Sequence, residues 1–248
     1  PQGVDPKTAL PYEYTEDNTT DVHYNTLNLK EIKLKDTWVA MDETRDAYTG
    51  HFDTAVDGDK TAYSGTKSIN IQMTRPFAKL RVITTDMVEL TNLGIIPTSA
   101  TVKYNTNTNH YQSFNAVAGK VVENSKTIKE KTHTYTIADY TDFVDTANKD
   151  SHKVLFTDYF FATDVQEVIN FSLDVYDQGG NPIGNTKNFS TPIPAQRNYL
   201  TTISGNILTD GNNVKVDVQD AFADADGNEQ HIYIYEYNGY IYEPLVLS

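Results

Sequence analysis

Six histidines are the residues of this chain that most readily bind metals or carry protons near neutral pH. They are spread along the whole sequence, at His23, His51, His110, His133, His152 and His231. They form no HxH or HExxH pattern, and the chain has no cysteine that could complete a zinc site. We therefore expect each histidine to lie on the surface or at a strand edge, and we expect no metal site.

Patterns that would indicate an enzyme are weak. Residues 64–67 (SGTK) match the Ser-x-x-Lys pattern of some acyl-transfer enzymes, but the partner motifs of that class are missing. Carboxylates are numerous, yet none stands out in an apolar setting that would raise its pKa. The chain also has no glycine-rich phosphate loop. We expect a protein that is not an enzyme, with no catalytic residues and no cofactor.

Residues 224–229 (DADGNE) look like half of a calcium-binding loop. Phe222 occupies the place of the first acidic ligand, and the twelve-residue frame is not completed. A solvated turn is therefore favoured over a calcium site, which stays open as the alternative.

Charge and composition limit the partners. The 248 residues carry a formal net charge of -14, whereas nucleic acid and anionic membranes need a basic surface. No run approaches the roughly 20 apolar residues that span a bilayer. With 17 Tyr and 10 Phe, the chain can build a core. We expect a folded chain that binds no nucleic acid and does not span a membrane.

Short extended segments separated by turn residues dominate the sequence, which is typical of β-sandwiches and barrels. Residues 86–94 are the clearest helical segment, because Asp86 suits an N-cap and Gly94 a C-terminal stop. The predicted fold is all-β with few short helices. Residues 68–86 are expected to hold two strands that meet at Pro76, the second with Leu80, Val82 and Thr84 alternating. The further segments expected to be strands are 98–104, 111–114, 120–123, 133–137, 154–161, 168–176, 186–190, 197–208 and 214–218.

Pro76 separates two alternating segments, and we place a domain boundary next to it. The prediction is two antiparallel sandwiches in series, an N-terminal β domain at 1–74 and a C-terminal β-sandwich domain at 75–228. Residues 229–248 form a tail. In this tail tyrosine alternates with isoleucine up to Tyr237, Asn238-Gly239 follows, and a second apolar segment begins at Tyr240. The pattern predicts a β-hairpin with Tyr237 opposite Tyr240.

An isolated hairpin is marginal in water, so either the chain's own sheet or a neighbouring molecule must cover it. If a neighbouring molecule covers the hairpin, the apolar residues of the hairpin fill pockets of another subunit. In the alternative, its tyrosines, which lie on the other face, provide a platform for a host protein or a glycan. The candidate interface residues are Ile232, Ile234, Ile241, Leu245, Val246 and Leu247, and the candidate binding face is Tyr235, Tyr237, Tyr240 and Tyr242.

Two stretches together resemble the paired signatures of Bacteroidales fimbrillins. They are residues 75–86 (RPFAKLRVITTD) and residues 193–209 (IPAQRNYLTTISGNILT). Residues 42–48 (DETRDAY) also look like the segment that closes the first domain of such proteins. The resemblance covers roughly residues 27–222. Compared with the family, we expect the first domain of this chain to be short of its first strands.

The resemblance implies two transthyretin-like β-sandwich domains and a subunit of type V pili, exported to the outer membrane and polymerised by strand donation. The expected partners are copies of the chain or other pilus subunits, and the expected location is the fimbrium. Residues 53–55 and 145–147 match a short O-glycosylation pattern of that phylum. The alternative is a monomeric, surface-anchored binding module of the same fold.

Overall fold

The computed structural model describes residues 23–35, 42–50, 73–105, 108–126, 131–137, 150–209, 214–220, 234–237 and 240–241. Several predictions fall outside these residues. They concern His51, His231, the SGTK segment at 64–67, the short patterns at 53–55 and 145–147, the loop at 224–229, and Ile232, Tyr242, Leu245, Val246 and Leu247.

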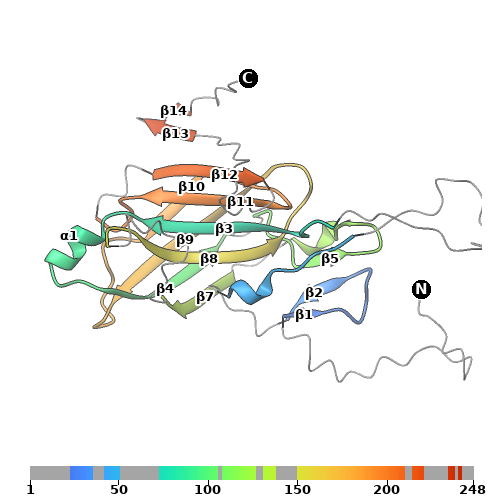
Figure 1. Ribbon diagram of the computed structural model, residues 1–248, viewed down its shortest axis with the longest axis horizontal. Helices are drawn as coiled ribbons and strands as arrows, with labels where there is room; N and C mark the ends of the chain where they lie inside the picture. Colours follow the sequence, from blue (N-terminus) through green and yellow to red (C-terminus); the bar gives the residue numbers. More distant parts are fainter. Residues whose placement is uncertain are drawn as a thin grey trace, which may run out of the picture.

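The described strands form three sheets (Figure 1). The six-stranded sheet has the order β14-β13-β12-β11-β3-β8, and the second sheet has the order β10-β9-β4-β7. A small third sheet has the order β1-β2-β5-β6. The bounds are β1 Tyr24–Asn25, β2 Ile32–Leu34, β3 Phe77–Thr84, β4 Pro97–Tyr104, β5 Ser113–Asn115, β6 Lys120–Val121, β7 Lys131–Thr136, β8 Lys153–Phe161, β9 Glu167–Asp177, β10 Lys187–Ala195, β11 Tyr199–Gly205, β12 Val214–Asp220, β13 Ile234–Tyr237 and β14 Tyr240–Ile241.

Helical structure is limited to short segments, namely η1 Glu43–Arg45, α1 Met87–Asn92 and η3 Glu123–Ser125. In the part of the chain that the structure describes, no helix is long and apolar enough to cross a membrane. The all-β prediction is confirmed. The division into two domains remains a prediction, and Ile32 of β2 pairs with Phe114 of β5 across the boundary expected near Pro76.

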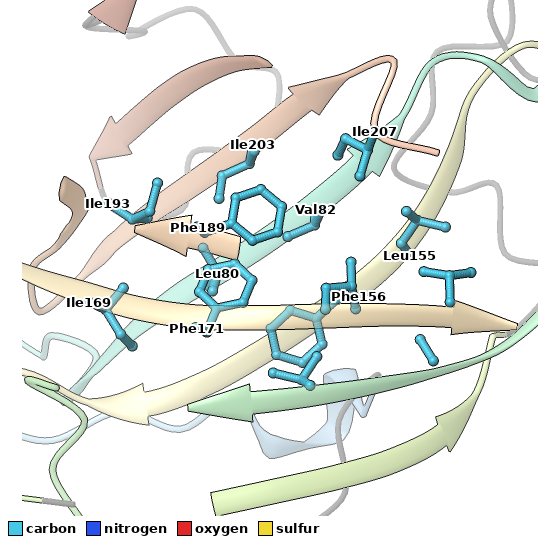
Figure 2. Packing of buried hydrophobic residues seen from close by; sticks show 14 of the residues in the cluster. Leu80, Val82, Leu155, Phe156, Ile169, Phe171, Phe189, Ile193, Ile203 and Ile207 are labelled. Atoms are coloured by element: carbon cyan, nitrogen blue, oxygen red, sulfur yellow. The ribbon is translucent and has the colours of Figure 1, made fainter. Parts of the chain in front are cut away.

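The main core lies between the two larger sheets (Figure 2). Leu80 and Val82 of β3 and Phe156 of β8 come from one sheet, and Phe171 and Phe189 come from the other. The rings of Phe171 and Phe189 stack with their centroids 4.5 Å apart. Side chains of two sheets that pack face to face in this way form a β-sandwich.

A second core lies on the other face of β3 and β8. Successive side chains of a strand point to opposite faces, so Phe77 and Phe161 face away from the sandwich core. Their rings stack 5.0 Å apart, and Tyr24 of β1 and Phe114 of β5 pack onto them. The small sheet therefore covers this face, and β3 and β8 contribute to both cores.

Asp86 does not play the role predicted for it. Helix α1 begins directly after Asp86, but the carboxylate caps none of the helix N–H groups. It accepts hydrogen bonds from the backbone N–H groups of Leu208 and Thr209, at 2.9 and 2.7 Å, and from the hydroxyl of Thr84. The buried carboxylate thus joins the end of β3 to the segment that follows β11.

We expect Asp86→Ala to lower the free energy of unfolding by about 2–4 kcal/mol, because it leaves the buried N–H groups of Leu208 and Thr209 without their acceptor, at about 1–3 kcal/mol for each unpaired group. Urea denaturation measures the change. Glu89→Ala is the control, because it removes an exposed carboxylate from the same helix. It should change the free energy of unfolding by no more than about 0.5 kcal/mol. Equal losses in the two variants would contradict this role of Asp86.

Candidate functional site

The C-terminal hairpin has the register that the sequence predicts. β13 and β14 pair antiparallel, with Tyr237 opposite Tyr240 and Glu236 opposite Ile241. Ile234 and Tyr235 also lie on β13. The hairpin therefore carries five of the predicted interface and binding-face residues at one end of the six-stranded sheet (Figure 1).

A short contact joins the hairpin to the sheet. β12 pairs with β11 along all seven of its residues, from Val214 to Asp220. On its other side, the described pairs with β13 are two, Lys215 with Tyr235 and Val216 with Ile234. The hairpin is thus an edge element attached by main-chain pairing over a short length of β12.

The three segments that resemble fimbrillin motifs meet in the middle of the same sheet, around β3 and β11. β3 and β11 pair in parallel, with Leu200 opposite Lys79 and Gly205 opposite Thr84. Asn198, just before β11, has φ 69°, a left-handed conformation that asparagine tolerates better than most residues. Its N–H donates to the carbonyl of Phe77 at 2.7 Å. The two motif strands are therefore fixed to each other where they begin.

The DETRDAY segment reaches this junction through two arginine–aspartate pairs. Arg75 donates to Asp46 through Nε at 2.7 Å and through Nη2 at 2.8 Å. Arg45 donates through Nη1 to Asp158 at 3.0 Å and through Nη2 to the carbonyl of Tyr159 at 2.7 Å. The side chains of Arg45 and Asp158 are both 0% exposed, so this pair is entirely buried.

Aromatic residues complete the surroundings of Asp158. Tyr104 donates its hydroxyl to the second carboxylate oxygen at 2.5 Å, and His110 Nε2 lies 3.9 Å from it. Tyr24 donates its hydroxyl to the carbonyl of Arg45 at 2.5 Å, and burial raises the pKa of this hydroxyl. A buried ion pair needs such additional hydrogen bonds to offset its desolvation.

One prediction is wrong at this junction. His110 does not lie at the surface: it is fully buried, and its ring stacks on Phe160 at 5.0 Å. Asp158 is buried as well, and Arg45, Tyr104 and His110 surround its carboxylate. Thr157 and Asp158 together interrupt the apolar run from Val154 to Phe161.

The junction holds its segments together through a buried ion pair. Arg45 and Asp158 neutralise each other in the core. Among the described residues, no three of the His, Asp or Glu side chains are grouped so that they could hold a metal ion. A shallow, open depression lies elsewhere, between β2 and η3, and Glu31, Lys33 and Asn124 help to line it. The hairpin is therefore the candidate interaction site.

A family model described as "Family of unknown function (DUF6562)" matches residues 12–238. The chain belongs to this family. No curated protein matches it. One solved structure, described as a candidate cell adhesion protein from Bacteroides uniformis, is 15% identical, with a TM-score of 0.35. The match covers 62% of this chain and 54% of that one, so the chain spans about half the length of that protein.

We expect Arg45→Ala to lower the free energy of unfolding by about 3–5 kcal/mol, because it leaves the charge of Asp158 buried without its partner. Urea denaturation measures this loss. Lys33→Ala is the control, since its pair with Glu31 is exposed and such pairs contribute about 0–1 kcal/mol. A loss for Arg45→Ala no larger than that of the control would show that the buried pair does not hold the junction.

Proposed function

We propose that this protein is a structural and adhesive subunit of a bacterial surface fimbria, exported to the outer membrane, that polymerises by donating its C-terminal hairpin to a neighbouring subunit. The observation that carries the proposal is the place of the hairpin. It lies at the end of a sheet, and the described pairs join it to β12 only at Lys215 and Val216.

Main-chain pairing makes the exchange feasible. The N–H and C=O groups at the edge of β12 pair with any extended strand, whether it comes from the same chain or from another copy. A hairpin that takes the same register on a neighbour replaces each lost hydrogen bond with an equal one, which is how domain swapping links protomers at low cost. When each chain gives its hairpin to the next, the contact is head to tail and the assembly stays open.

Side chains of the tail would give the exchange its specificity. In strand addition the main chain supplies affinity, and alternate side chains fill pockets on the acceptor. We assign this role to the apolar residues of the tail, which are Ile232, Ile234, Ile241, Leu245, Val246 and Leu247. The resemblance of residues 75–86 and 193–209 to fimbrillin signatures supports the same function.

A monomeric, surface-anchored binding module is the second candidate. Tyr237 and Tyr240 are register partners, and such partners have neighbouring side chains on one face of a hairpin. With Tyr235 and Tyr242 they would form an aromatic surface suited to stacking on a sugar or anchoring a host protein. In this case the hairpin stays on its own sheet.

Deletion of residues 229–248 separates the two functions. The truncated chain should lose every filament seen by negative-stain microscopy, because the hairpin whose strand β13 pairs with β12 is gone, while the full chain forms filaments under the same conditions. The control replaces Tyr237 and Tyr240 by phenylalanine, which keeps the strands and removes only the hydroxyl groups, and it should polymerise like the full chain. Filaments that persist after the deletion, or a full chain that stays monomeric, would contradict strand donation.

A further inference from the structure

An amine, a carboxamide and a carboxylate from three separate segments meet beside the buried ring of Tyr111. Lys126 Nζ donates a hydrogen bond to Asn109 Oδ1 at 2.7 Å and lies 3.6 Å from Glu167 Oε1. The same nitrogen lies 5.2 Å from the centroid of the Tyr111 ring, which is fully buried. Three groups that can react together are therefore in contact.

Further contacts orient each of these groups. Asn109 donates its Nδ2 to the carbonyl of Val168 at 3.0 Å, so its carbonyl oxygen faces the lysine. Glu167 accepts hydrogen bonds from the hydroxyl of Tyr111 at 3.2 Å and from that of Thr163 at 3.1 Å. A β-bridge between Tyr111 and Lys126 fixes the backbone of the lysine. Because these contacts already hold the groups in place, a reaction between them loses little further conformational entropy.

We propose that Lys126 and Asn109 form an intramolecular isopeptide bond. Glu167 takes a proton from the Lys126 ammonium, and the neutral Nζ attacks Cγ of Asn109, forming the new C–N bond. Glu167 then returns the proton to Nδ2, the Cγ–Nδ2 bond breaks, and the second proton of Nζ passes through Glu167 to the departing ammonia, which leaves as ammonium. The step exchanges one amide for another, so it needs no oxidant, reductant or cofactor.

The geometry is close to that needed for attack. A carbonyl bond is about 1.2 Å long, so the hydrogen bond to Oδ1 places Nζ no farther than about 3.9 Å from Cγ. Reacting atoms approach to about 3–3.5 Å, which a small rotation of the lysine side chain provides. The side chains of Lys126 and Glu167 are 37% and 24% exposed, so water reaches the site and the released ammonia can leave. Only the neutral amine attacks, so the rate rises with pH.

The bond would stabilise a chain that has no other covalent staple. The sequence contains no cysteine, so no disulfide can form. A link from Asn109 to Lys126 closes a loop that includes β5, β6 and η3, which belong to or follow the small sheet. Like a disulfide, such a link limits the freedom of the unfolded chain.

The intact mass of the full chain tests this inference after incubation of the folded protein at alkaline pH. The wild-type chain should be lighter than its sequence by one ammonia molecule, and a tryptic digest should contain two peptides joined at Asn109 and Lys126. Lys126→Arg keeps the positive charge and should keep the full mass. Glu167→Gln should slow the reaction by about 100-fold or more, the usual contribution of a positioned proton carrier.

Two results would overturn the inference. One is a wild-type chain that keeps its full sequence mass after the incubation. The other is ammonia loss that the tryptic digest of Lys126→Arg locates at Asn109, since Asn109 would then cyclise onto its own backbone instead of reacting with the lysine. The three reacting residues lie outside the hairpin. Both results are therefore independent of assembly and of the role of the hairpin.

Discussion

Parallel pairing of β3 with β11 brings together two strands that lie far apart in the sequence. The two strands form the middle of the six-stranded sheet, between β12 and β8. Their first residues are joined by the hydrogen bond from Asn198 to Phe77, and Asp86 joins their far ends. β8 extends the sheet on one side and β12 on the other, so the hairpin and the Arg45–Asp158 pair both depend on this contact.

β3 and β8 also link the two cores, because each is buried on both faces. On one face lies the sandwich core, and on the other lies the small sheet with Tyr24 and Phe114. The guanidinium of Arg45 binds both the side chain of Asp158 and the carbonyl of Tyr159, two consecutive residues of β8. It therefore also occupies a carbonyl group at the side of β8 that faces away from β3. An antiparallel bridge from Tyr111 to Phe161 also covers the outer side of β8, and the hairpin lies on the β12 side of the sheet.

Local pattern predicted much of this fold. Alternation and turn residues located the strands from β3 to β12, and Gly94, with φ 72°, ends α1 as expected. Asn238-Gly239 predicted the register that places Tyr237 opposite Tyr240. These features depend on neighbours in sequence. His110 and the carboxylate of Asp86 were misjudged because their burial and partners come from distant segments. The same distance hid the pairing of Arg45 with Asp158, 113 residues apart. The meeting of Lys126, Asn109 and Glu167 has no sequence signal for the same reason.

Strand donation can be measured directly with introduced cysteines, because the chain has no cysteine of its own. Lys215 and Tyr235 are register partners, and directly opposed residues are close enough for a disulfide. One chain would carry Lys215→Cys and the other Tyr235→Cys, and the two would be mixed, assembled and oxidised. Our account predicts a disulfide between the two chains, at a yield well above that of a mixture in which exposed Lys33→Cys replaces Lys215→Cys. A disulfide that forms only when both cysteines are in one chain, and only within that chain, would show that the hairpin stays on its own sheet and would contradict the account.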